Sequence, residues 1–286
     1  MLELMLPALV AALLLAASHG YLGIHIIARG VIFVDLALAQ VAALGYTAAT
    51  LIGFGPSSAV AYGMGLGATL LGALVFSLSR IRHAFITQEA IIGIVYVVAS
   101  AGTILLAAQA PRGSEHVEEL LTGTLLWVTW PQILKTALAY MLIFGIHWLF
   151  RNRFLTISLH PETAEEKKWS LGGWDFLFYA LFGVVVTLSV AIAGVLLVFS
   201  FLVIPAVIAF LFTRRPGTLL AIALSSGTAA TVLGLVVSFQ TDLPTGPAVV
   251  CAFGVTLVLA FLLRRVWRPR LERIPVPESA SAPVDG

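Results

Sequence analysis

Charged residues are scarce in this sequence: Asp, Glu, Lys and Arg make up 10% of its 286 residues, whereas 60% are hydrophobic. Soluble globular domains carry about 25% charged residues, so this composition excludes a chain whose surface lies mostly in water. A mean hydropathy of +1.03 points the same way. Because about 20 helical residues cross the roughly 30 Å core of a bilayer, the apolar stretches predict an all-α, polytopic integral membrane protein.

Cysteine and lysine are also in short supply. The single cysteine, Cys251, excludes an intramolecular disulfide and any cysteine-based metal cluster. Only three lysines are present and none follows a glycine, so the glycine-rich phosphate loop of ATPases is missing. The sequence also has no HExxH pattern and no nucleophile elbow. These absences predict that the chain is not an enzyme and does not hydrolyse ATP by itself.

Eight apolar segments follow one another along the chain, and one of them is twice the usual length. They cover roughly residues 4–27, 31–54, 59–78, 89–108, 128–150, 174–212, 218–239 and 246–267. The segment 174–212 must turn back, and Ala193-Gly194 is the expected hinge because a glycine midway leaves about 20 residues on each side. The sequence therefore predicts nine spans, with eight as the alternative.

The placement of basic residues predicts the orientation of these spans. With the N-terminus outside, all of the 16 Lys and Arg residues except Arg112 and Lys135 fall on one side. The positive-inside rule assigns that side to the cytoplasm, together with the C-terminus. Residues 274–286 are rich in Pro, Ser and Ala without apolar periodicity, which predicts a disordered cytoplasmic tail after a single membrane domain, 1–273.

Ionisable residues inside spans are functional candidates because burying a charge in lipid is costly. Asp35 lies in VIFVDLALAQVAALG, on the same helical strip as Ala39 and Ala42. A carboxylate among small residues suits a cation path or tight helix packing. The alternative is a carboxylate near the cytoplasmic end that caps a neighbouring helix or pairs with Arg29.

Other polar residues lie near the ends of spans. Glu89 opens the fourth span, where Thr87 is placed to cap the helix and the helix dipole favours a carboxylate. Glu115 and His116 lie in an acidic outer loop that either attracts cations or docks a partner, or is simply solvated. Three histidines lack a second ligand at i+3 or i+4, which argues against a preformed metal cage: His19, His25 and His147.

Glycine and proline indicate where helices pack closely or bend. Gly63 and Gly67 form a small-xxx-small pair of the kind that lets two membrane helices approach closely. Pro205 interrupts the apolar helix in GVLLVFSFLVIPAVIAFLF. Together with the hinge at Gly194, it predicts a bent helix that can move.

Four stretches resemble, in the same order, the permeases of the bacterial zinc/manganese/iron ABC import family. They are VIFVDLALAQVAALG, QEAIIGIVY, GVLLVFSFLVIPAVIAFLF and DLPTGPAVV. The resemblance implies the membrane subunit of an importer in the bacterial cytoplasmic membrane, with a divalent metal as cargo and surrounded by lipid. Its implied partners are a second copy of the chain, an ATPase subunit that holds ATP and Mg²⁺, and a periplasmic or lipoprotein metal-binding protein. No cofactor on this chain and no nucleic acid is implied.

The resemblance also assigns roles to two groups of residues. The stretch SLHPETAEEKK, within 158–170, is similar to the family's cytoplasmic coupling helix, and Pro161, Glu162 and Ala164 match its D-P-E-x-A pattern. A solvated loop is the alternative. In many relatives the second helix reads D-x-x-x-H, and this sequence keeps Asp35 but has Ala39 in place of the histidine. Either looser oxygen ligands assist Asp35, or the cargo differs from zinc.

A transporter of another class also fits these residues. An ion-coupled secondary carrier would use Asp35 or Glu89 as its proton or sodium site. Dependence on a partner ATPase distinguishes this alternative from an ABC permease.

Overall fold

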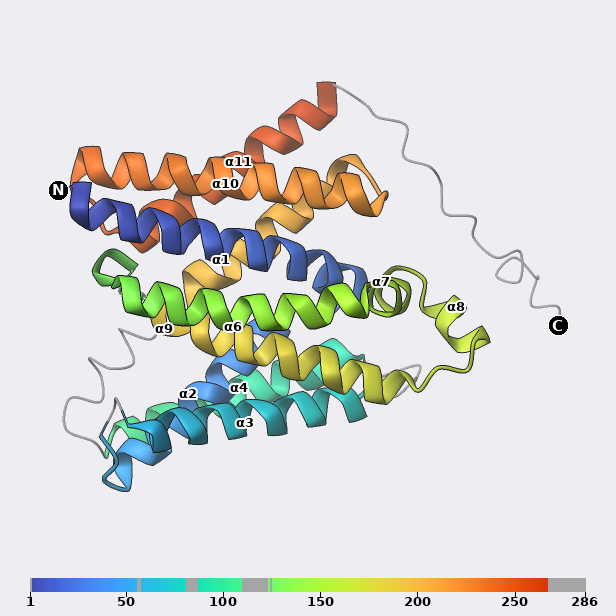
Figure 1. Cartoon of the computed structure of the whole chain (residues 1–286), viewed down its shortest axis with the longest axis horizontal. Coiled ribbons are helices and arrows are strands. Elements are labelled where there is room, and N and C mark those ends of the chain that lie inside the picture. The colour runs from blue at the N-terminus through green and yellow to red at the C-terminus, as the bar shows by residue number, and fades with distance from the viewer. Residues whose placement is uncertain (1, 56–57, 81–86, 110–122, 124, 267–286) are drawn as a thin grey trace, which may run out of the picture.

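The computed structural model describes residues 2–55, 58–80, 87–109, 123 and 125–266. Within these ranges every regular element is helical (Figure 1). The elements are α1 (Leu2–Arg29), α2 (Val34–Leu51), α3 (Ala59–Leu78), α4 (Gln88–Ala107), the short 3₁₀ helix η1 (Leu125–Trp127), α6 (Trp130–Leu149), α7 (Arg151–Leu159), α8 (Pro161–Glu166), α9 (Leu171–Phe212), α10 (Pro216–Thr241) and α11 (Thr245–Val266). The predicted tail, 274–286, and the outer-loop residues Glu115 and His116 lie outside the described residues.

Eight of these helices are long and apolar enough to cross a membrane, namely α1, α2, α3, α4, α6, α9, α10 and α11. Seven of them have 18 to 28 residues, close to the length that one crossing requires. The prediction of an all-α, multi-pass membrane protein is confirmed.

The remaining helix, α9, has 42 residues and reverses its direction at Gly194. Asp175, near the start of α9, forms an ion pair with Arg29 of α1. Ala209, near the end of α9, packs in one cluster with Ile24, which also belongs to α1. A straight helix would separate Asp175 from Ala209 by about 51 Å, but Ile24 and Arg29 lie only about 7.5 Å apart along α1. The two halves of α9 therefore run antiparallel (Figure 1), so the eight candidate helices are long enough for the nine crossings that the sequence predicts.

The backbone at this reversal has a conformation that suits glycine. Gly194 has φ 73° and ψ 162°, in a region that residues with a side chain rarely adopt. Gly123, itself at φ 70°, approaches the same bend so closely that a Cβ atom on it would lie 2.2 Å from the carbonyl carbon of Ala193. Two glycines thus allow direct backbone contact where the chain turns back.

The centre of the bundle is formed by α1 and α9, with α2, α3 and α4 packed together on one side and α10 and α11 on the other (Figure 1). Glycines allow close approach at several crossings: a Cβ atom on Gly23 of α1 would lie 2.0 Å from the carbonyl oxygen of Leu202 in α9. Gly63 and Gly67 make no close helix contact within the described residues, none of which places an atom within 4 Å of either Cβ position. Gly65, on the opposite face of α3, packs against α2 instead.

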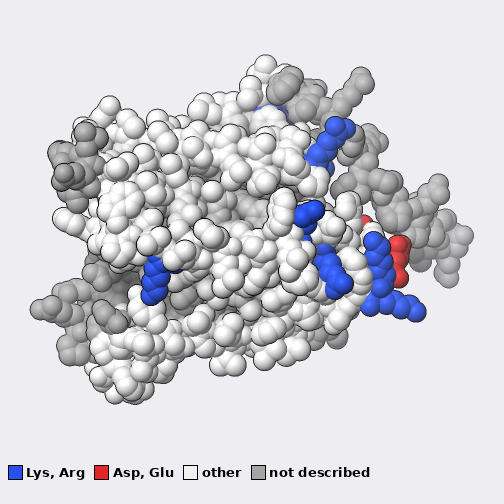
Figure 2. Space-filling model, in the orientation of Figure 1, with Lys and Arg blue, Asp and Glu red and all other residues white. Residues whose placement is uncertain are grey.

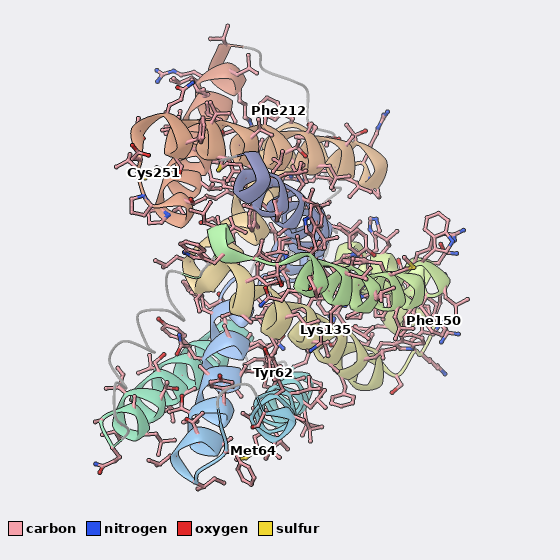
Figure 3. The ribbon with its side chains drawn as sticks, turned by 60° about the vertical axis from the view of Figure 1, so that its left-hand side comes forward. Tyr62, Met64, Lys135, Phe150, Phe212 and Cys251 are labelled. Carbon is pink, nitrogen blue, oxygen red and sulfur yellow. The ribbon has the colours of Figure 1, made fainter. Side chains whose placement is uncertain are left out.

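Basic side chains gather at the end of the bundle that carries α7 and α8, which we call the basic end (Figure 2). The orientation predicted from the sequence by the positive-inside rule assigns this end to the cytoplasm. The exception Lys135 lies in α6, where its Nζ atom is 5.0 Å from the ring centroid of Tyr62 in α3 (Figure 3). This cation–π contact accommodates a charge on the apolar flank of the bundle.

Candidate functional site

Asp35 occupies the first turn of α2 and is 1% exposed. Its Oδ1 atom has no hydrogen-bond partner among the described residues. The expected alternative, an ion pair with Arg29, is wrong because Arg29 is bound to Asp175 at 2.6 Å. The dipole of α2 favours a negative charge in this first turn, yet a buried carboxylate oxygen without a donor is costly unless a cation or proton joins it. Asp35 is therefore available to a cation.

The surroundings of Asp35 do not form a metal cage. Ala39, one turn along α2, is buried and has no ligating atom in its side chain. In the part of the chain that the structure describes, no group of three His, Cys, Asp or Glu side chains is placed to hold one metal ion. A cation at Asp35 would therefore meet fewer than three such side chains of the described residues, which suits brief passage better than tight retention.

Glu89 joins the beginnings of two helices. Thr87 caps α4 by accepting a hydrogen bond from the backbone of Ala90 at 3.3 Å, as the sequence predicts. The Oε1 atom of Glu89 accepts a hydrogen bond from the backbone N–H of Phe33, at the start of α2, at 3.0 Å. The carboxylate thus binds the N-terminus of a neighbouring helix, a structural role that sequence spacing did not indicate.

Two of the three histidines lie side by side, although they are far apart in sequence. The rings of His25 in α1 and His147 in α6 have centroids 6.2 Å apart. Nδ1 of His25 is 2.9 Å from the hydroxyl of Ser158, and Nδ1 of His147 is 3.3 Å from the hydroxyl of Tyr21. The third histidine, His19, bonds within its own helix. Both paired imidazoles are thereby oriented by hydroxyl groups of this chain.

The predicted coupling segment, 158–170, contains the last residues of α7 and the whole of α8, at the basic end. α8 begins at Pro161, as expected for proline in the first helical turn, and it packs against α7. The side chain of Glu162 is 66% exposed, whereas Ala164 is fully buried in the chain itself. Of the residues matched to the coupling pattern, Glu162 is thus accessible to another protein, and Ala164 is part of the buried side of α8.

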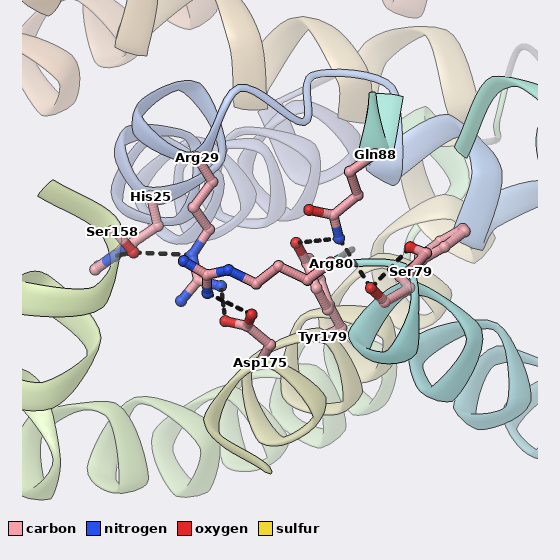
Figure 4. A network of polar contacts seen from close by, with 9 residues as sticks. His25, Arg29, Ser79, Arg80, Gln88, Ser158, Asp175 and Tyr179 are labelled. Carbon is pink, nitrogen blue, oxygen red and sulfur yellow. Dashed lines mark hydrogen bonds and ion pairs between the residues drawn. The ribbon is translucent and has the colours of Figure 1, made fainter. Parts of the chain in front are cut away.

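A polar network connects this segment with the bundle (Figure 4). The Ser158 hydroxyl accepts a hydrogen bond from Nε of Arg29 at 2.9 Å. The two oxygens of Asp175 then accept from Arg29 at 2.6 Å and from Arg80 at 2.5 Å. Ser158 and Asp175 are 2% and 1% exposed, respectively. Neither was singled out from the sequence, where an Asp directly after Trp174 and inside an apolar run was the available signal.

Comparisons with known proteins identify the family to which this chain is similar. A family model described as the ABC 3 transport family matches residues 1–264. The chain is 26% identical over 276 residues to the chelated iron transport system membrane protein YfeC of Yersinia pestis, covering 94% of this chain and 92% of the relative. It is 25% identical over 262 residues to the manganese transport system membrane protein MntC of Listeria monocytogenes, covering 89% of each.

A solved structure has the same fold. In PsaBC from Streptococcus pneumoniae in complex with Fab, one chain superposes with a TM-score of 0.73 and 22% identity, covering 89% of this chain and 90% of that one. Among the first curated relatives, the matched stretch covers from 61% to 94% of their own length. Since the family model extends over nearly all of the described bundle, the chain belongs to the ABC 3 transport family.

Proposed function

We propose that this chain is the membrane-spanning permease subunit of an ABC importer for a divalent metal ion in the bacterial cytoplasmic membrane. The observation that carries the proposal is Asp35, a fully buried carboxylate with an unpartnered oxygen, in a chain of this family. Relatives named for chelated iron and for manganese support a metal as cargo. The permease itself is non-catalytic.

The chemistry at Asp35 favours manganese or ferrous iron over zinc. Carboxylate oxygen is a hard ligand that suits Mn²⁺, whereas zinc prefers to add imidazole or thiolate. Alanine at position 39 leaves the buried face of α2 without an imidazole next to Asp35. The Asp35 carboxylate attracts the ion into the apolar interior and releases it again, because the remaining ligands can be water or backbone oxygen.

The energy comes from a partner that binds at the basic end. With no glycine-rich phosphate loop in the sequence, ATP and Mg²⁺ belong to a separate ATPase subunit. The exposed face of α8, with Glu162, is the surface where that subunit would dock. A metal-binding protein would deliver the ion at the opposite end, and a second copy of the chain would complete the pathway. Closure of the ATPase pair then shifts the helices between outward and inward openings.

Reconstitution tests this function directly. The chain is purified with the ATPase and solute-binding proteins encoded beside it, placed in proteoliposomes, and assayed for ATP-driven uptake of Mn²⁺, Fe²⁺ and Zn²⁺. We expect uptake that requires ATP, prefers Mn²⁺ or Fe²⁺, and falls with Asp35→Asn but not with Asp242→Asn, which changes an exposed carboxylate at the C-terminal cap of α10. Uptake driven by a proton or sodium gradient without any ATPase would overturn the proposal in favour of a secondary carrier.

A further inference from the structure

The polar network at the basic end joins one cytoplasmic segment to three membrane helices. Ser158 comes from α7, Arg29 from the last turn of α1, Arg80 from the residues directly after α3, and Asp175 from the first turns of α9. Figure 4 shows their side chains converging on one point. Such a convergence of segments up to 146 residues apart is made by the fold, not by local sequence.

The hydroxyl of Ser158 has the geometry of a bridge. It lies 2.9 Å from Nε of Arg29 and 2.9 Å from Nδ1 of His25. Because Nε of arginine can only donate, the hydroxyl accepts there and keeps its own hydrogen for the imidazole. Ser158 therefore ties the end of α7 to two side chains on the same face of α1.

Asp175 likewise forms a bridge, between Arg29 at the end of α1 and Arg80 directly after α3. Each of its oxygens accepts from a different arginine, and the carboxylate is 1% exposed. The guanidinium of Arg29 also lies 4.0 Å above the ring of Phe178, one turn further along α9. Separating Arg29 from Asp175 would deprive two buried charges of this partner, which is strongly unfavourable in a low dielectric. The three helix ends are thus held as one unit.

The coupling segment is attached rigidly to this unit. Its helix α8 packs on α7 and buries Ala164, and α7 buries Phe154 and Ile157 together with Ser158. A push on α8 is therefore transmitted to Ser158 with little internal movement. From Ser158 it reaches Arg29 and, through Asp175, Arg80.

We infer that Ser158 and Asp175 are positioning residues that couple movement of the α7–α8 segment to the cytoplasmic ends of α1, α3 and α9. This inference rests on the proposed ABC function, since it assumes that an ATPase acts on α8. Neither residue touches the cargo or ATP. Their role is to make the helix ends move together with the segment that the ATPase displaces.

The test measures metal ions taken up per ATP hydrolysed in proteoliposomes holding the permease, its ATPase and its binding protein. The variants are Ser158→Ala and Asp175→Asn. The matched control is Ser238→Ala, since the Ser238 hydroxyl is also buried and also bridges two elements, bonding the Leu243 carbonyl at 2.8 Å and the Thr245 hydroxyl at 3.1 Å. We expect the two network variants to lower uptake per ATP by about threefold or more, the effect of losing one buried hydrogen bond, and the control to keep it.

The outcomes separate coupling from simple stability. If a network residue served only to hold the fold together, its variant would lower the amount of assembled complex while uptake per ATP stayed at the wild-type value, and this result would overturn the inference. If Asp175→Asn fails to assemble, Ser158→Ala decides alone, because it removes only one hydroxyl. If the wild-type complex shows no ATP-driven uptake, the proposed function fails first, and that failure is visible without any variant.

Discussion

Replacing Gly194 with alanine tests whether the reversal of α9 depends on a backbone conformation that suits glycine. At φ 73° and ψ 162° this residue lies in a region where a side chain costs about 1–3 kcal/mol. The start and the end of α9 both pack on the same end of α1, so the strain cannot be relieved by straightening the helix without losing one of those contacts. We expect Gly194→Ala to lower the free energy of unfolding by about 1–3 kcal/mol.

Two other glycines calibrate this effect. In the described part of the chain no atom lies within 4 Å of the Cβ position of Gly145 in α6, so Gly145→Ala should be neutral or stabilising by roughly 0.5–1 kcal/mol, the helix preference of alanine. Gly123→Ala should be at least as harmful as Gly194→Ala. It combines a positive φ with a Cβ atom only 2.2 Å from the backbone of Ala193.

The assay is reversible unfolding of the purified chain by sodium dodecyl sulfate from mild detergent micelles, followed by tryptophan fluorescence. The expected order of stability is Gly145→Ala, then wild type, then Gly194→Ala and Gly123→Ala. A Gly194→Ala protein as stable as Gly145→Ala would refute the reasoning, because it would mean that the reversal tolerates a side chain and is not governed by this residue.

Three further outcomes follow from the site. Asp35→Asn should reduce metal uptake about tenfold, since a loss of about 1.4 kcal/mol of attraction for the ion is a factor of ten, while gel filtration shows normal assembly. Glu162→Arg should weaken binding of the ATPase subunit without changing the stability of the permease, as measured by co-purification and unfolding, because its side chain is exposed. Arg80→Gln should destabilise the chain less than Arg29→Gln, by SDS unfolding, since Arg80 is 27% exposed and Arg29 5%.

Much of the architecture followed from periodicity and composition. The length of the run 174–212, about twice one crossing, required a reversal, and the glycine near its middle identified the place. Likewise, Thr87 and Pro161 mark the starts of α4 and α8 because capping and first-turn preferences act between residues a few positions apart. These features depend on local chemistry, which a single sequence records.

The contacts of the site could not be read in the same way. Arg29 lies six positions before Asp35, which made an ion pair between them one of the alternatives, but Gly30 at φ 68° ends α1 and the arginine meets Asp175 instead. The small pair in α3 has the right spacing, yet spacing does not say which face meets a neighbour, and Gly65 is the residue that packs. Long-range partners are selected by how helices assemble, and no periodic signal records that choice.

The hydrogen-bond partners of the two buried aspartates distinguish a structural carboxylate from one that is a candidate for binding cargo. Asp35 and Asp175 are both 1% exposed, so burial alone does not distinguish them. Asp175 has an arginine on each oxygen, and its charge is fully committed within the fold. Asp35 keeps an oxygen without any partner among the described residues. A carboxylate that is already paired with two cations has nothing left for a third, whereas Asp35, under the proposed function, keeps an oxygen for an incoming metal ion.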